Sequence, residues 1–95
     1  MAHSFISRFK IFPAKEALFL ETCRRMEEAV ARHEPEVYFY KFYRLREPNT
    51  FAVIESFIDE AADQAHQNSP HFKKIGPAMI ECIDGGYVRE YLDPL

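Results

Sequence analysis

The sequence contains no tryptophan, only three glycines, only two cysteines and no long run of apolar residues. A membrane-spanning helix needs roughly 20 consecutive apolar residues, so we expect no contact with a membrane. The first residues lack the long apolar core of a signal peptide, and a cytoplasmic location is therefore expected. Cys23 and Cys82 match no metal-binding spacing and are too few for a disulfide framework, so both are expected to be reduced, buried thiols.

Basic residues are neither numerous nor clustered. Twelve Lys and Arg stand against fifteen Asp and Glu, which gives a net charge of −3. Nucleic-acid binding requires a basic patch, so this class of partner is not expected. The 47% hydrophobic content excludes a disordered chain. The length suits one domain, residues 1–95, and a chain this short buries only about two-thirds of its unfolded surface, which favours a homodimer.

The hydrophobic pattern changes period along the chain and so predicts both strands and helices. Polar and apolar residues alternate over residues 3–11, as in a half-buried strand, and apolar residues recur at helical spacing over residues 14–34. Asp59 and Ser69 are suitable N-caps for two further helices, and Gly76-Pro77 is expected to bend or interrupt the second. The predicted elements are strand 3–11, helix 14–34, strands 37–45 and 50–58, helices 60–67 and 70–84, and strand 87–92.

This β-α-β-β-α-β order predicts an α+β, ferredoxin-like protomer, with one antiparallel sheet and its helices on one face. Strand 37–45 carries large rings on both sides. Strict alternation places Val37 with Phe39 and Tyr43 on one side, and Tyr40 with Phe42 on the other. A second subunit on the open face of the sheet would cover the rings that the helices do not reach.

Three ionisable residues, Glu55, His66 and His71, lie close to one predicted strand–helix junction. Glu55 shares a strand face with Phe51, Val53 and Phe57, so its pKa is expected to rise if that face meets the helices. His66 follows Ala61, Ala62 and Ala65, the expected inner face of its helix. Together the three residues form a plausible proton-transfer set for a phenolic or enolisable ligand. The alternative is that Glu55 is exposed or ion-paired and that the histidines cap helices.

No metal or nucleotide site is expected. His66 and His71 are five residues apart with a helix break between them, whereas helical metal ligands favour spacings of three or four, and no third ligand is obvious. The only glycine pair, Gly85-Gly86, follows a helix, whereas a phosphate loop precedes one. There is no nucleophile elbow for a serine triad.

Residues 34–75 read EPEVYFYKFYRLREPNTFAVIESFIDEAADQAHQNSPHFKKI, and this stretch resembles the antibiotic biosynthesis monooxygenase domain family, which includes proteins described as quinol monooxygenases. In that family a Glu-Pro turn leads into a Tyr-containing strand, a Pro-Asn turn, a strand ending in Glu-x-Trp, and a helix with Ala-x-x-x-His-x-x-Ser-x-His-Phe. The matching residues here are Glu34-Pro35, Tyr40, Tyr43, Pro48-Asn49, Glu55 to Phe57, Ala62, His66, Ser69, His71 and Phe72.

The resemblance implies a ferredoxin-like protomer that dimerises sheet to sheet into an α+β barrel. It also implies a cofactor-independent monooxygenase acting on a small aromatic phenol or quinol, because the family's oxygenases often work without metal, flavin or haem. His66 or His71 would be the base and Glu55 would tune it. The implied substrate-binding residues are Tyr40 and Asn49, which would orient oxygens, and Phe57, Phe39 and Phe72, which would form apolar walls.

Two departures from the family pattern bear on this expectation. Phe57 stands where the family has Trp, so an indole N–H is missing, and Glu36 stands where the family has Gly. Haem-degrading relatives carry a histidine where this chain reads Lys73 to Gly76, so haem is not expected. Relatives on this scaffold also include isomerases. The alternatives are therefore an isomerase, or a non-catalytic dimeric module that binds a small aromatic or quinone-like ligand or acts in a stress response.

Overall fold

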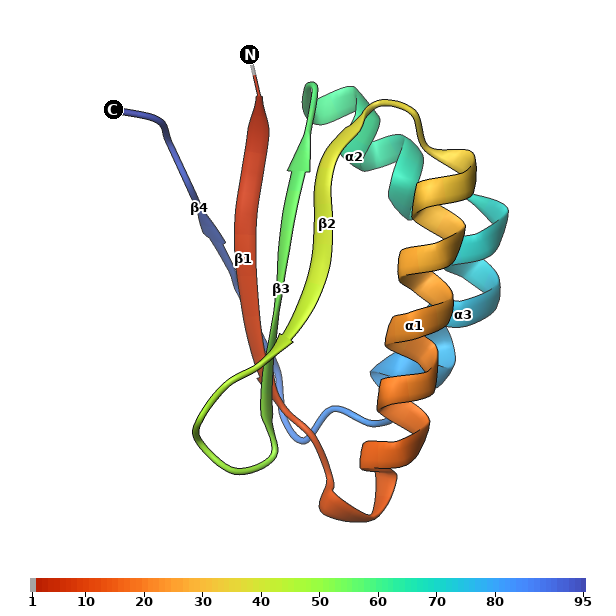
Figure 1. Ribbon diagram of the computed structural model, residues 1–95, viewed down its shortest axis with the longest axis vertical. Helices are drawn as coiled ribbons and strands as arrows, with labels where there is room; N and C mark the ends of the chain where they lie inside the picture. The colour runs from red at the N-terminus through yellow and green to blue at the C-terminus, as the bar shows by residue number, and fades with distance from the viewer. Residues whose placement is uncertain (1) are drawn as a thin grey trace.

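A computed structural model describes residues 2–95 and shows a four-stranded sheet covered by helices on one face (Figure 1). The strands lie in the order β2-β3-β1-β4, and every neighbouring pair is antiparallel. The elements are β1 (His3–Lys10), a short 3-10 helix (Pro13–Lys15), α1 (Glu16–His33), β2 (Val37–Arg44), β3 (Thr50–Phe57), α2 (Glu60–Gln67), α3 (Pro70–Ile80) and β4 (Arg89–Tyr91). This is the predicted ferredoxin-like α+β fold. No helix within residues 2–95 is long and apolar enough to cross a membrane.

The two central strands pair along their whole length. The register runs from His3 opposite Phe57 to Lys10 opposite Thr50. Side chains of β1 and β3 that face the helices are mostly apolar. The polar ones are Ser7 and Glu55, which are also buried, and His3, whose Nε2 lies 3.0 Å from Oδ2 of Asp63 on α2. The sheet therefore places the Glu55 carboxyl group inside a mainly apolar layer.

An irregularity near the start of β2 changes which rings share a face. The register between β2 and β3 shifts between Val37 and Phe39. As a result Val37 packs with Tyr40 and Phe42 against the helix side, while Phe39 pairs with Ser56 on the outer face. The prediction that Val37 and Phe39 share a face is wrong, because a bulge adds a residue to one strand and reverses the alternation beyond it.

Helix α1 covers the sheet with the predicted apolar stripe. The residues buried along it are Phe19, Cys23, Met26 and Val30. The ring centres of Phe19 and of Phe51 on β3 are 5.0 Å apart. Complete burial of one such side chain contributes about 1.5–3 kcal/mol, so this stripe is a main source of stability. Both cysteines are buried and unpaired, as expected, and burial raises the pKa of the Cys23 thiol.

Both predicted N-caps are present. The Asp59 carboxylate accepts a hydrogen bond from the backbone N–H of Ala62 at 2.9 Å, and the Ser69 hydroxyl accepts one from Phe72 at 3.1 Å. Such caps satisfy N–H groups that have no partner inside the helix. They fix the points at which α2 and α3 begin.

Two details of the helices differ from the predictions. Helix α3 runs through Gly76-Pro77 without interruption and ends at Ile80 rather than near residue 84. The chain then turns back to the sheet, where Ile83 bridges to Ile11. The buried face of α2 consists of Ala62, Asp63 and His66, whereas Ala61 and Ala65 are exposed.

Candidate functional site

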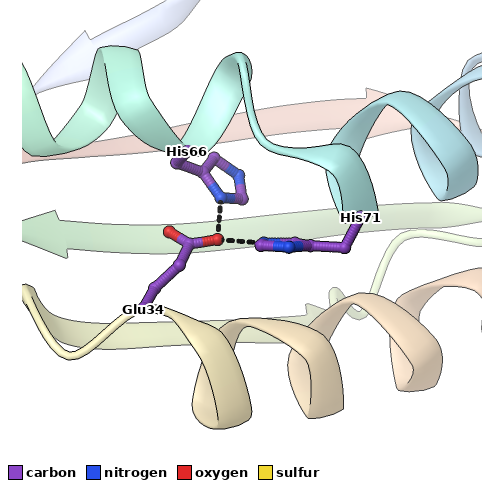
Figure 2. A group of neighbouring side chains, drawn as sticks. All are labelled: Glu34, His66 and His71. Atoms are coloured by element: carbon purple, nitrogen blue, oxygen red, sulfur yellow. Dashed lines mark hydrogen bonds and ion pairs between the residues drawn. The ribbon is translucent and has the colours of Figure 1, made fainter.

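Two histidines and one glutamate meet where the three helices come together (Figure 2). Oε2 of Glu34, the residue after α1, lies 2.7 Å from Nδ1 of His66 on α2. The same oxygen has a still closer contact with Nε2 of His71 on α3. Figure 2 shows both imidazole rings directed at this single carboxylate oxygen. One carboxylate therefore holds two imidazoles in place.

The break between α2 and α3 makes this convergence possible. The Ser69 hydroxyl donates to the carbonyl of His66 at 2.7 Å while it caps α3. This turn reorients the chain, so His66 and His71 face the same point although their spacing does not match one continuous helix. Glu34 approaches the two histidines from the C-terminal end of α1, where Pro35 prevents the helix from continuing.

The Glu34 carboxylate is held in its charged form. Burial alone would raise its pKa, but the hydrogen bonds from His66 and His71 outweigh burial and lower it. An ionised carboxylate only accepts hydrogen bonds, so Nδ1 of His66 carries the proton that it donates to Glu34. In a neutral His66 the lone pair then lies on Nε2, on the opposite side of the ring.

Nε2 of His66 faces a second carboxyl group, that of Glu55 on β3. Its Oε1 lies 3.9 Å away, and Glu55 is only 8% exposed. Burial raises the pKa of Glu55 to about 8, against a lowering effect of Arg89, which confirms the expected direction. Tyr40 lies directly opposite Glu55 on β2, and burial raises its pKa as well. At neutral pH, Glu55 and Tyr40 are therefore uncharged hydrogen-bond donors.

His66 separates two hollows. An outer pocket of about 600 Å³ opens beside the helix ends and is lined by residues including His33, Glu34, Val37, His66, His71 and Lys74. An inner cavity of about 120 Å³ lies between sheet and helices, with a wall that is mainly aromatic and apolar and that includes Tyr40, Phe42, Glu55, His66, Phe72 and Arg89. Glu34, the partner of Nδ1, lines the outer pocket, and Glu55, which lies near Nε2, lines the inner cavity.

The structure brings together most of the side chains predicted for the site. The ring centres of Phe57 and Phe72 lie 5.6 Å and 5.0 Å from the centre of the His66 ring, and the ring centre of Tyr40 lies 5.2 Å from it. Phe39 does not join them, because it lies on the outer face of the sheet. Asn49 is also elsewhere, in the β2–β3 turn, where it has a φ of 56° and its carbonyl accepts from the Ile11 N–H.

Three residues of this region were not among the predicted site residues. Glu34 is the third member of the histidine cluster; its only sequence signal is the Glu-Pro pair that ends α1. Arg89 places its guanidinium 3.9 Å from the centre of the Phe5 ring and donates to both carboxylate oxygens of Asp63, at 2.5 and 3.2 Å. Asp63 and Arg89 are 26 residues apart, and no local pattern in the sequence indicates their pairing.

The sequence profile of the family described as antibiotic biosynthesis monooxygenase matches residues 3–77. The chain belongs to this family. The match begins with β1 and ends inside α3, so it includes every strand and helix that supplies the histidine cluster. Membership in the antibiotic biosynthesis monooxygenase family supports a monooxygenase-like function in general terms and leaves the substrate open.

Individual relatives agree with this assignment. The Bacillus subtilis protein named "Putative monooxygenase YcnE" is 30% identical over 64 residues, which cover 67% of each chain. A crystal structure from Caulobacter crescentus, described as a "putative antibiotic biosynthesis monooxygenase", is 28% identical with a TM-score of 0.92, covering 99% of this chain and 90% of the other. A conserved protein from Methanosarcina mazei is 26% identical with a TM-score of 0.87, covering 97% and 91%.

Proposed function

We propose that this protein is a monooxygenase that oxidises a small aromatic phenol or quinol without a resident cofactor, and that the inner cavity binds the substrate. The observation that carries the proposal is the position of His66. Its Nδ1 is held by the Glu34 carboxylate at 2.7 Å, and its Nε2 faces Glu55 across 3.9 Å. A carboxylate that orients an imidazole in this way prepares the opposite nitrogen to act as a base.

The gap between His66 and Glu55 fits one hydroxyl group. A substrate oxygen about 2.7 Å from both Nε2 of His66 and Oε1 of Glu55 could form a hydrogen bond with each, with an angle of roughly 90° between the two bonds. A phenolic O–H placed there would donate to Nε2 of His66 and accept from the protonated carboxyl of Glu55, whose pKa burial raises to about 8. Proton transfer to His66 would then leave a phenolate that Glu55 stabilises by donating a hydrogen bond.

The walls of the cavity suit an aromatic ring of limited size. Phe72, Phe42 and Tyr40 line the cavity, and the Tyr40 hydroxyl is the proposed partner of a second substrate oxygen. The volume of about 120 Å³ is below the roughly 300–1,000 Å³ of typical ligand pockets. We therefore infer a substrate with a single ring. Phe57 packs behind His66 and would support the base rather than contact the substrate.

The proposed reaction uses the substrate as its own electron donor. Deprotonation by His66 makes the ring electron-rich, and the ring then reduces dioxygen. One oxygen atom becomes a hydroxyl on a ring carbon and the other leaves as water, so a quinol and O₂ yield a hydroxyquinone and H₂O. Apolar walls around the reacting ring would exclude bulk water from the intermediate.

We also propose that the protein is a homodimer that associates through the outer face of the sheet. Phe39 and Tyr43 on this face are 42% and 40% exposed, and Ile54 lies between them on the neighbouring strand. Large apolar groups gathered on one face are typical of a protein–protein contact. The second copy would cover the rings that the helices leave open.

Oxygen uptake tests the proposed function. Chelator-treated protein is mixed with a series of one-ring quinols and phenols in an oxygen-electrode chamber, and wild type is compared with His66→Ala, His71→Ala and the nearby control His33→Ala. We expect uptake above the buffer rate that His66→Ala abolishes, that His71→Ala lowers, and that the control keeps. The proposal is refuted if no substrate consumes oxygen faster than buffer, or if His66→Ala retains the full rate. Turnover under nitrogen would instead indicate an isomerase, and binding without turnover a non-catalytic module.

A further inference from the structure

We propose that Glu34, His66 and His71 form a binding site for a divalent transition-metal ion, accessible from the outer pocket. One suitable ligand atom from each residue lies within 4.8 Å of the other two. Two imidazole nitrogens and one carboxylate oxygen are a ligand set that proteins use for zinc and for non-haem iron. Metal binding at this site does not depend on the function proposed above.

The distances require only a small adjustment to accept an ion. Zinc lies about 2.0–2.2 Å from nitrogen and oxygen ligands, so tetrahedral ligand atoms are about 3.4 Å apart. Oε2 of Glu34 is now 2.7 Å from Nδ1 of His66 and closer still to Nε2 of His71. Insertion of an ion therefore needs the Glu34 oxygen to move away from both nitrogens by about 1 Å or less. It also needs the two nitrogens, which lie within 4.8 Å of each other, to reach the same spacing of about 3.4 Å. Glu34 follows the last residue of α1, where a side-chain rotation can supply this movement.

The three ligands are held by separate elements and shielded from solvent. Their side chains are 11%, 2% and 13% exposed for Glu34, His66 and His71. The set comes from the end of α1, from α2 and from α3, and the Ser69 turn fixes the angle between the two histidines. Ligands positioned by the folded chain in advance reduce the entropy cost of binding an ion.

The outer pocket leaves room for further ligands on one side of the site, and the Glu55 carboxyl lies behind His66 on the other. The outer pocket of about 600 Å³ borders all three ligands, so water or an anion can occupy the remaining coordination positions. Behind His66, the Glu55 carboxyl lies 3.9 Å from Nε2, in the direction from which metal-bound histidines usually find a carboxylate partner. Imidazole nitrogens favour zinc, iron or copper over magnesium or calcium.

Metal binding would also change the chemistry of His66. An ion on Nδ1 takes the lone pair of that nitrogen, so the ring proton of a neutral His66 must move to Nε2. Nε2 would then donate towards Glu55 and could no longer accept a proton from a substrate in the inner cavity. Metal would therefore inhibit the proposed monooxygenase reaction. This consequence, unlike the binding itself, rests on the proposed function.

Metal titration of the tag-free, chelator-treated protein tests the site. Calorimetry with Zn²⁺ should give one site per chain, and Co²⁺ should give intense visible bands of a four- or five-coordinate ion. Glu34→Gln and His71→Gln should each weaken binding by at least about 100-fold, whereas the control His33→Gln should bind like wild type. His33 suits this role because it borders the same pocket and stacks on His71, with ring centres 5.6 Å apart, but is not part of the ligand set.

The following results would overturn the metal site. Wild type binds neither ion at a tenfold excess, the Co²⁺ spectrum is that of the hexaaqua ion, or the Glu34 and His71 variants bind as tightly as the control. Circular dichroism shows whether each variant is folded, and the Co²⁺ spectrum of wild type decides the question if a variant is not. Zinc that binds without slowing quinol-dependent oxygen uptake would keep the site and refute His66 as the base. Oxygen uptake by a protein that binds no metal would keep the proposed function and refute the metal site.

Discussion

Replacing Glu55 with glutamine should stabilise the protein increasingly as the pH rises. Burial raises the pKa of Glu55 from 4.5 to about 8. Between these values the unfolded chain has lost the proton that the folded chain retains. The stabilising contribution of this group is therefore complete below pH 4.5 and is lost as the pH rises through the folded pKa, by about 1.4 kcal/mol per pH unit. The total loss of stability reaches at most about 5 kcal/mol. The glutamine variant does not undergo this loss, because glutamine does not ionise.

Urea unfolding of both proteins at several pH values between 5 and 8, at one fixed protein concentration, measures this effect. The unfolding free energy of Glu55→Gln minus that of wild type should increase steadily across the series, while the dependence on urea concentration stays the same. A difference that is constant from pH 5 to pH 8 would refute the reasoning. It would mean that Glu55 is already charged in the folded protein, and the donor role proposed for it towards a phenolate would also be wrong.

Three further predictions concern the framework around the site. For Asp63, burial would raise the pKa, but hydrogen bonds led by that of Arg89 lower it below 3.8. Asp63→Asn should cost about 3 kcal/mol at pH 7. The cost should fall as the pH drops from 3.8 through the lower pKa of the folded state, because the unfolded aspartate takes up its proton first. An equal cost in urea unfolding at pH 7 and pH 2.5 would contradict the ion pair. Ser69→Ala should lose about 1 kcal/mol by removing the cap of α3; an unchanged urea midpoint would mean that the cap is not needed. Ile54→Lys should convert a dimer to a monomer in light scattering, and an unchanged mass would exclude the outer face as the contact.

The parts of the fold that were predicted correctly depend on residues close together in the sequence. The caps at Asp59 and Ser69 act over three residues, and the apolar stripe of α1 repeats every turn. Alternation along one strand placed Glu55 on the same face as Phe51, Val53 and Phe57, and the structure shows that this face is the buried one. In each case the sequence near the residue determines the structure, because hydrogen bonding or burial involves only a turn or a strand face.

The parts that were not predicted depend on contacts between distant residues. Glu34 meets His66 and His71 across 32 and 37 positions, so the spacing of the two histidines alone argued against a shared metal site. The bulge near Val37 has no local signal, and it places Phe39 away from the site. A helix break and the antiparallel sheet bring these groups together, and neither effect can be measured from residue spacing.

The central claim is that His66 and Glu55 prepare a phenol or quinol in the inner cavity for reaction with oxygen. The most direct test is turnover of a one-ring quinol by chelator-treated protein under ¹⁸O₂, followed by mass spectrometry of the organic product. The account predicts one ¹⁸O atom on the product ring, the other in water, and loss of labelling in His66→Ala. An unlabelled product, or hydrogen peroxide formed in equal amount to the quinone, would contradict it.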